Sequence, residues 1–66
     1  MLKCTYKNNK FPKKQYACYV DSWSHNVQYY VQESVDGNTG QKLEMSKVQF
    51  ENFELVLKTN GWFEAA

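Results

Sequence analysis

The sequence contains no arginine and no isoleucine, a single proline, a single histidine and only two cysteines among 66 residues. It also has no long apolar run, so residues 1–6 do not resemble a signal peptide and no segment is long enough to cross a membrane. We therefore expect a cytoplasmic protein without a membrane segment. Two cysteines without a Cys-x-x-Cys motif do not form a disulfide framework, and one histidine does not supply the ligands of a zinc site, so we expect no metal.

The short length limits what the chain can do. A protein of this size forms one domain, residues 1–66, and buries only about 60% of the surface that its unfolded chain exposes. Such a core contributes about 3–5 kcal/mol to stability. This excludes a second domain and a deep cofactor cleft, so we expect no cofactor.

Aromatic residues are abundant: two Trp, five Tyr and four Phe make up 17% of the chain, more rings than so small a core readily accommodates. Charge is uneven along the sequence. Residues 1–30 contain five lysines and one acidic residue, whereas residues 31–66 contain three lysines and six acidic residues. A basic half suits an anionic partner, although it is also typical of a solvated surface.

The apolar pattern changes from the period of a strand to that of a helix along the chain. Alternation and β-forming residues predict strands over residues 1–7, 15–23 and 27–35, with a short fourth strand over 41–45. Turns are predicted at 24–26 and 36–40, where residue types that tolerate left-handed backbone gather.

A helix is then predicted between two capping signals. Ser46 followed by Gln49 forms a capping-box pattern, and Asn60-Gly61 is typical of a helix carboxyl end. A strand over residues 53–57 is the alternative, which the caps disfavour. We therefore predict an α+β fold: a three- to four-stranded antiparallel β-meander with one C-terminal α-helix packed on one face.

Strand register follows from the apolar pattern. In the first hairpin, Cys4 is expected opposite Cys18 and Leu2 opposite Val20, and in the second hairpin a two-residue turn places Val20 opposite Tyr29. The predicted core side of the sheet also includes Tyr6, Tyr16, Val31, Leu43 and Met45. The predicted helix and the segment after it cover that side with Phe50, Phe53, Val56, Leu57 and Trp62, with Phe63 beside them.

One helix covers only one face of a sheet, so the other face should remain open. The same register places Lys3, Tyr19 and Tyr30 in one row of that face, with Gln28 opposite Asp21 and Trp23 near the turn. Cross-strand aromatic pairing alone stabilises sheets by about 0.2–1 kcal/mol and is one explanation for these rings. A binding surface is the other, with Lys3, Tyr19, Trp23, Gln28 and Tyr30 as candidate partner-binding residues.

Catalytic chemistry has little support, and we expect no catalytic residues and no enzyme activity. His25 lies between serines in sequence, but neighbours in sequence are not a spatial relay. Glu51 and Glu54 are explained by the dipole near the start of a helix. Cys4 and Cys18, as cross-strand neighbours, either form a disulfide or remain two reduced, buried thiols.

The sequence thus predicts a small regulator or inhibitor, of the kind that phages and mobile elements encode, which docks on a partner protein through the aromatic sheet face. The alternative is a nucleic-acid-binding module, in which the sheet aromatics stack on bases and a lysine cluster contacts phosphates. The missing arginine argues against it. The cluster comprises Lys7, Lys10, Lys13 and Lys14. A homodimer is a third expectation, because so small a core gains from association.

Overall fold

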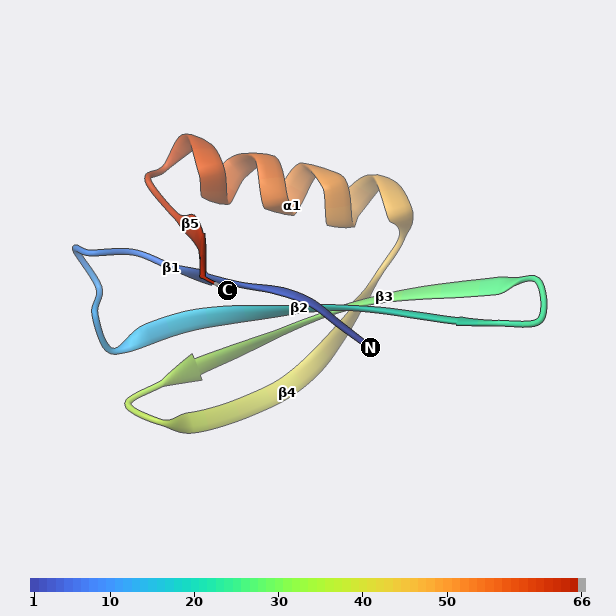
Figure 1. Ribbon diagram of the computed structural model, residues 1–66, viewed down its shortest axis with the longest axis horizontal. Coiled ribbons are helices and arrows are strands. Elements are labelled where there is room, and N and C mark those ends of the chain that lie inside the picture. Colours follow the sequence, from blue (N-terminus) through green and yellow to red (C-terminus); the bar gives the residue numbers. More distant parts are fainter. Residues whose placement is uncertain (66) are drawn as a thin grey trace.

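The computed structural model describes residues 1–65 and contains a five-stranded antiparallel sheet with one helix. The sheet order is β4-β3-β2-β1-β5, and α1 lies over one face of the sheet (Figure 1). The bounds of the elements are β1 Leu2–Lys7, β2 Lys14–Trp23, β3 Asn26–Val35, β4 Asn38–Met45, α1 Lys47–Thr59 and β5 Phe63–Ala65. The predicted α+β class and helix are confirmed, but the sheet has five strands, not three to four.

The helix ends are built as the sequence predicts. Ser46 accepts a hydrogen bond from the Gln49 backbone while the Gln49 side chain accepts one from the Ser46 backbone, which completes the capping box. At the other end Gly61 has φ 87°, and the Trp62 amide donates to the Leu57 carbonyl at 2.9 Å, as in a Schellman motif. This reversal directs the chain back to β1, where β5 pairs with it.

The β2–β3 hairpin agrees with the sequence-based prediction more closely than the β3–β4 hairpin does. The β2–β3 register is as predicted along its whole length, from Lys14 opposite Val35 to Trp23 opposite Asn26. β4 begins earlier than predicted because the turn is limited to Asp36-Gly37, in which both residues have positive φ.

The β1–β2 register is interrupted by a bulge, which corrects part of the prediction. Cys4 lies opposite Cys18 as expected, but Leu2 lies opposite Tyr19, so Lys3 is the extra residue of β1. A bulge shifts the side chains beyond it to the other face. Leu2 therefore leaves the core side on which it was expected, and it is 51% exposed.

The core is smaller than the predicted one. Its buried members are Tyr6, Cys18, Val31, Phe50 and Leu57. Tyr29, Met45, Phe53 and Trp62 pack partly buried against them, whereas Leu43 and Val56, expected in the core, are exposed at 58% and 56%. The 13-residue helix α1 is too short to span a membrane, and no helix within residues 1–65 is long and apolar enough to do so.

Candidate functional site

The sheet face opposite α1, here called the open face, is formed by Gln15, Ala17, Tyr19, Asp21 and Trp23 of β2 and by their cross-strand partners. In the described part of the chain, no element lies over this face (Figure 1). Register places Leu2, Tyr19, Tyr30 and Glu44 in one row across four strands. The row predicted from sequence is thus present, with Leu2 in the place expected for Lys3.

Polar neighbours hold the two tyrosines of this row in place. The Lys42 ammonium lies 4.3 Å from the centre of the Tyr19 ring, within range of a cation–π interaction. The Tyr19 hydroxyl donates to Gln32 at 3.3 Å, and the Tyr30 hydroxyl donates to Gln28. Gln28, a predicted site residue, therefore lies beside Tyr30.

Two further rings lie toward opposite ends of the open face. Trp23 is at the tip of the β2–β3 hairpin, which projects beyond the helix (Figure 1), and it is 48% exposed. Phe63 was expected beside the core, but it pairs with Lys7, so its side chain lies on the open face and is 46% exposed. The open face thus carries four aromatic residues rather than three.

The predicted lysine cluster is dispersed by the fold. Lys7 lies on the open face and Lys10 in the connection between β1 and β2, whereas Lys14 pairs with Glu33 at 3.4 Å and Lys13 with Asp36 at 3.8 Å. On the open face, Lys7 and Lys42 are balanced by Asp21 and Glu44. The face is therefore mixed in charge rather than basic.

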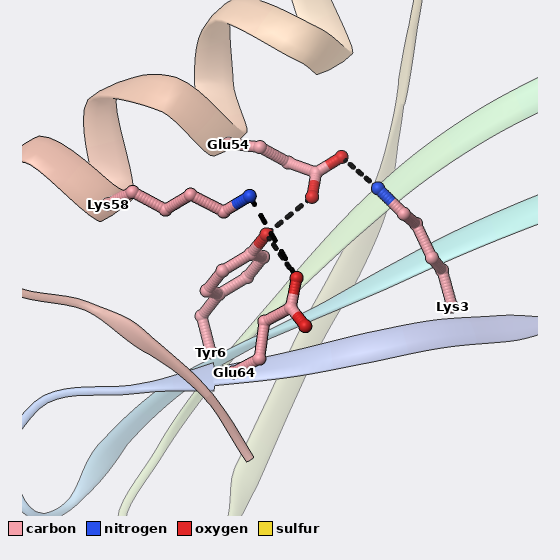
Figure 2. Close-up of polar contacts among 5 residues, drawn as sticks. All are labelled: Lys3, Tyr6, Glu54, Lys58 and Glu64. Carbon is pink, nitrogen blue, oxygen red and sulfur yellow. Dashed lines mark hydrogen bonds and ion pairs between the residues drawn. The ribbon is translucent and has the colours of Figure 1, made fainter. Parts of the chain in front are cut away.

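Lys3 is a predicted site residue whose side chain does not lie on the open face. The bulge turns its side chain toward α1, where the ammonium lies 2.6 Å from a carboxylate oxygen of Glu54. The other oxygen of Glu54 accepts a hydrogen bond from the Tyr6 hydroxyl, which also lies 3.3 Å from Glu64 (Figure 2). Lys58 lies 3.9 Å from Glu64. These five residues, Lys3, Tyr6, Glu54, Lys58 and Glu64, form the polar network beneath the helix.

The contacts among Lys3, Tyr6 and Glu54 shift the pKa values of these three residues. Burial opposes ionisation of Glu54, but the hydrogen bonds from Lys3 and Tyr6 and the charge of Lys3 outweigh it, so the pKa of the carboxyl is below its ordinary value. The hydrogen bond to Glu54 raises the pKa of Lys3. Burial, and then the same carboxylate, raise the pKa of Tyr6. Glu54 therefore stays charged and Tyr6 stays protonated near neutral pH.

The two cysteines are free thiols in adjacent strands. Burial raises the pKa of Cys18 to about 12, and burial likewise raises the pKa of Cys4. Since the thiolate is the reactive form, both are poor nucleophiles.

A mixed group of potential metal ligands lies beneath the helix. Within residues 1–65, Cys4, Glu54 and Glu64 bring donor atoms within 4.8 Å of one another. Both carboxylates already contact lysine ammonium groups, so a cation there would compete with Lys3 and Lys58. The arrangement is that of an ion-pair network.

A second surface, which sequence reasoning missed, lies on the helix side of the sheet. An apolar groove of about 630 Å³ runs between α1 and β4, and we call it the α1–β4 groove. Its lining is contributed by Leu43, Glu44, Met45, Gln49, Asn52, Phe53 and Val56. A second hollow of about 500 Å³ continues from it toward Tyr16 and Val35, and the two share Leu43, Met45 and Phe53.

The interpretation of Glu54 by the dipole at the start of the helix is wrong, because α1 has no acidic residue in its first turn and Glu54 is buried against Lys3 and Tyr6. Glu54 carried one signal: its spacing from Phe50 and Leu57 puts it on the buried stripe of the helix. Phe63 carried none, since its position depends on β5. Lys42 alternates with Leu43 and Met45 in the predicted fourth strand, so its place on the open face followed from that pattern, but it was not among the predicted site residues.

Comparison with known proteins identified no relative of this chain. No protein-family model, no curated protein sequence and no solved structure matches this chain.

Proposed function

We propose that the protein is a non-enzymatic binding protein that docks on a partner protein through the open face. The observation that carries this proposal is the set of four aromatic side chains on a sheet face that no described element covers: Tyr19, Trp23, Tyr30 and Phe63. Exposed aromatic residues supply large contact area with few rotatable bonds, and Trp and Tyr dominate the energy of protein interfaces. Its action is to occupy the partner's surface, as the small regulators and inhibitors of phages and mobile elements do.

The composition of the open face supports a protein partner over a nucleic acid. Leu2, rather than Lys3, completes the row of Tyr19 and Tyr30, which makes the centre of the face more apolar. Three of the five amino-terminal lysines form ion pairs with acidic residues of this chain: Lys3, Lys13 and Lys14. A phosphate backbone would have to displace those carboxylates, whereas the mixed rim of the open face suits the polar rim of a protein interface.

Site-specific photo-crosslinking tests the proposal directly. A photoreactive phenylalanine analogue is placed at position 30 or 23 on the open face, and at position 48 on α1 as the control, because Val48 is 67% exposed on the opposite side of the molecule. We expect one discrete protein adduct from positions 23 and 30 and none from position 48.

Competition then measures the contribution of the rings. Excess unlabelled protein should abolish the adduct, whereas the Tyr19→Ala/Tyr30→Ala double variant should compete at least about 30-fold less well, since one interface hot spot of about 2 kcal/mol already corresponds to that factor. Equal competition by the double variant, or equal adducts from position 48, contradicts the proposal.

The nucleic-acid alternative has its own readout. In a Trp62→Phe variant, Trp23 remains as the single Trp and reports directly on the open face. Titration with single- and double-stranded oligonucleotides at low salt should leave its emission unchanged. A salt-dependent quenching would favour the nucleic-acid function instead.

A further inference from the structure

The β4 strand is the long free edge of the sheet. It is the outermost strand on one side, has eight residues and is exposed at every position except Met45. A β-bulge interrupts its pairing with β3 between the Ser34–Thr39 and Gln32–Lys42 pairs, so its regular part is residues 42–45. The opposite edge strand, β5, has only three residues. An exposed edge presents unpaired backbone N–H and C=O groups that pair readily with another strand.

The sequence of β4 is complementary to itself in one antiparallel register. With Leu43 opposite Leu43 of a second copy, Lys42 faces the second copy's Glu44 and Glu44 faces its Lys42. A shift of two residues in either direction places Lys42 opposite Lys42 or Glu44 opposite Glu44. A shift of one residue sets apolar side chains opposite charged ones and disturbs both faces.

In that register, the helix-covered faces of the two copies lie on the same side of the joined sheet. Antiparallel strands of one sheet are related by a two-fold axis perpendicular to the sheet, so both helices lie on the same side. The Lys42–Glu44 pairs then lie on the open-face side, because Lys42 pairs with Gln32 and Glu44 with Tyr30. In the single chain the Lys42 ammonium lies 4.3 Å from the centre of the Tyr19 ring, so it must swing from that ring toward the edge to form the pair. On the helix side, Leu43 meets its counterpart at the mouth of the α1–β4 groove. The exposed apolar surface of Leu43 and Val56 would thereby be covered.

We propose that two copies of this chain associate through their β4 edges, in the register centred on Leu43, to form a continuous ten-stranded sheet with the two α1–β4 grooves joined. The charge complementarity of β4 with itself, beside an apolar groove, points to a second copy as the occupant rather than to an unrelated strand. The dimer presents both open faces on one side of the sheet. This inference does not depend on the partner proposed for the open face, since the association of two copies is measured without any partner.

A charge-swap series tests the proposal by sedimentation equilibrium of the purified chain without any partner. The wild-type protein should be a dimer at about 100 μM. Lys42→Glu and Glu44→Lys each place two like-charge pairs in the seam by symmetry, and each should weaken dimerisation at least about 10-fold. The double variant Lys42→Glu/Glu44→Lys restores opposite charges and should dimerise within about threefold of the wild type.

A pair of leucine variants provides the matched control. Leu43→Lys should abolish the dimer, whereas Leu55→Lys should not, because Leu55 is equally exposed on α1 but does not line the groove. Circular dichroism confirms that each variant is folded. A wild-type chain that stays monomeric at about 1 mM, where even a weak complex would form, overturns the proposal and leaves the edge to a strand of another protein. Failure of the double swap to restore dimerisation overturns the register.

Discussion

The two side chains of the Lys3–Glu54 ion pair differ in solvent exposure, so substituting the exposed partner tests how strongly the pair stabilises the fold. The Lys3 side chain is 46% exposed, whereas that of Glu54 is 8% exposed. Lys3→Met therefore leaves a buried carboxylate whose remaining donor is Tyr6. Hydrogen bonds to charged groups contribute about 1.5–3 kcal/mol, and partial hydration of Lys3 favours the lower half of that range. We expect the free energy of unfolding to fall by about 2 kcal/mol.

The small core makes this loss easy to measure. A loss of about 2 kcal/mol is about half of what a core of this size provides, and it should lower the Tm by about 8–16 °C. The double variant Lys3→Met/Glu54→Gln removes both charges, so it should be more stable than Lys3→Met alone.

The pH dependence follows from the lowered pKa of Glu54. In the wild type the ionised carboxylate stabilises the fold above its unfolded pKa of 4.5, and this contribution is lost as the pH falls through the lower folded value. Lys3→Met removes the hydrogen bond and the charge of Lys3, both of which lower the pKa of Glu54, so the ionised carboxylate stabilises the variant less than it stabilises the wild type. The difference between the two proteins should therefore shrink between pH 7 and pH 3.

Urea denaturation followed by circular dichroism at both pH values measures these differences. Lys10→Met serves as the control, because Lys10 is an exposed lysine of the β1–β2 connection. The reasoning is refuted if Lys3→Met lies within about 0.5 kcal/mol of the wild type at pH 7, the range expected of ordinary surface substitutions. It is also refuted if the double variant is no more stable than Lys3→Met.

Three further predictions concern buried or capping residues. Cys18 should resist iodoacetamide in the native protein at pH 8 and react in urea, as followed by mass spectrometry, because it is fully buried with its pKa raised to about 12. Gly61→Ala should cost about 1–2 kcal/mol in thermal unfolding, and Gly61→Asn less, since φ at this position is 87°. Ser46→Ala should cost about 1 kcal/mol in urea denaturation by removing the N-cap, whereas Ser46→Asp should be nearly neutral.

The parts of the fold that were predictable are those encoded by local pattern. Strand alternation around a two-residue turn determined the β2–β3 register, and with it the adjacency of Tyr19 and Tyr30. The capping box and Gly61 likewise mark the helix ends through residue types with specific backbone preferences. These features depend on neighbours in sequence, so they could be identified without tertiary contacts.

The bulge at Lys3 could not be predicted in the same way. Regular alternation through residues 1–7 favours an uninterrupted strand, and the contact that accompanies the bulge, with Glu54, is 51 residues away in sequence. The three residues of β5 are similarly too few to carry a periodic pattern. Leu2 and Phe63 lie on the open face because of the bulge and β5, respectively, so their positions could not be predicted from the sequence.

The placement of Glu54 also accounts for the exposed groove. The buried residues of α1 are Phe50, Glu54 and Leu57, whereas the apolar stripe of the sequence includes Phe53 and Val56 in place of Glu54. At 3.6 residues per turn these two lines differ by roughly 50° around the helix axis. Contact of Glu54 with Lys3 and Tyr6 thus turns Val56 away from the core and leaves Phe53 at the wall of the α1–β4 groove. The polar network and the apolar groove are therefore two consequences of one helix orientation.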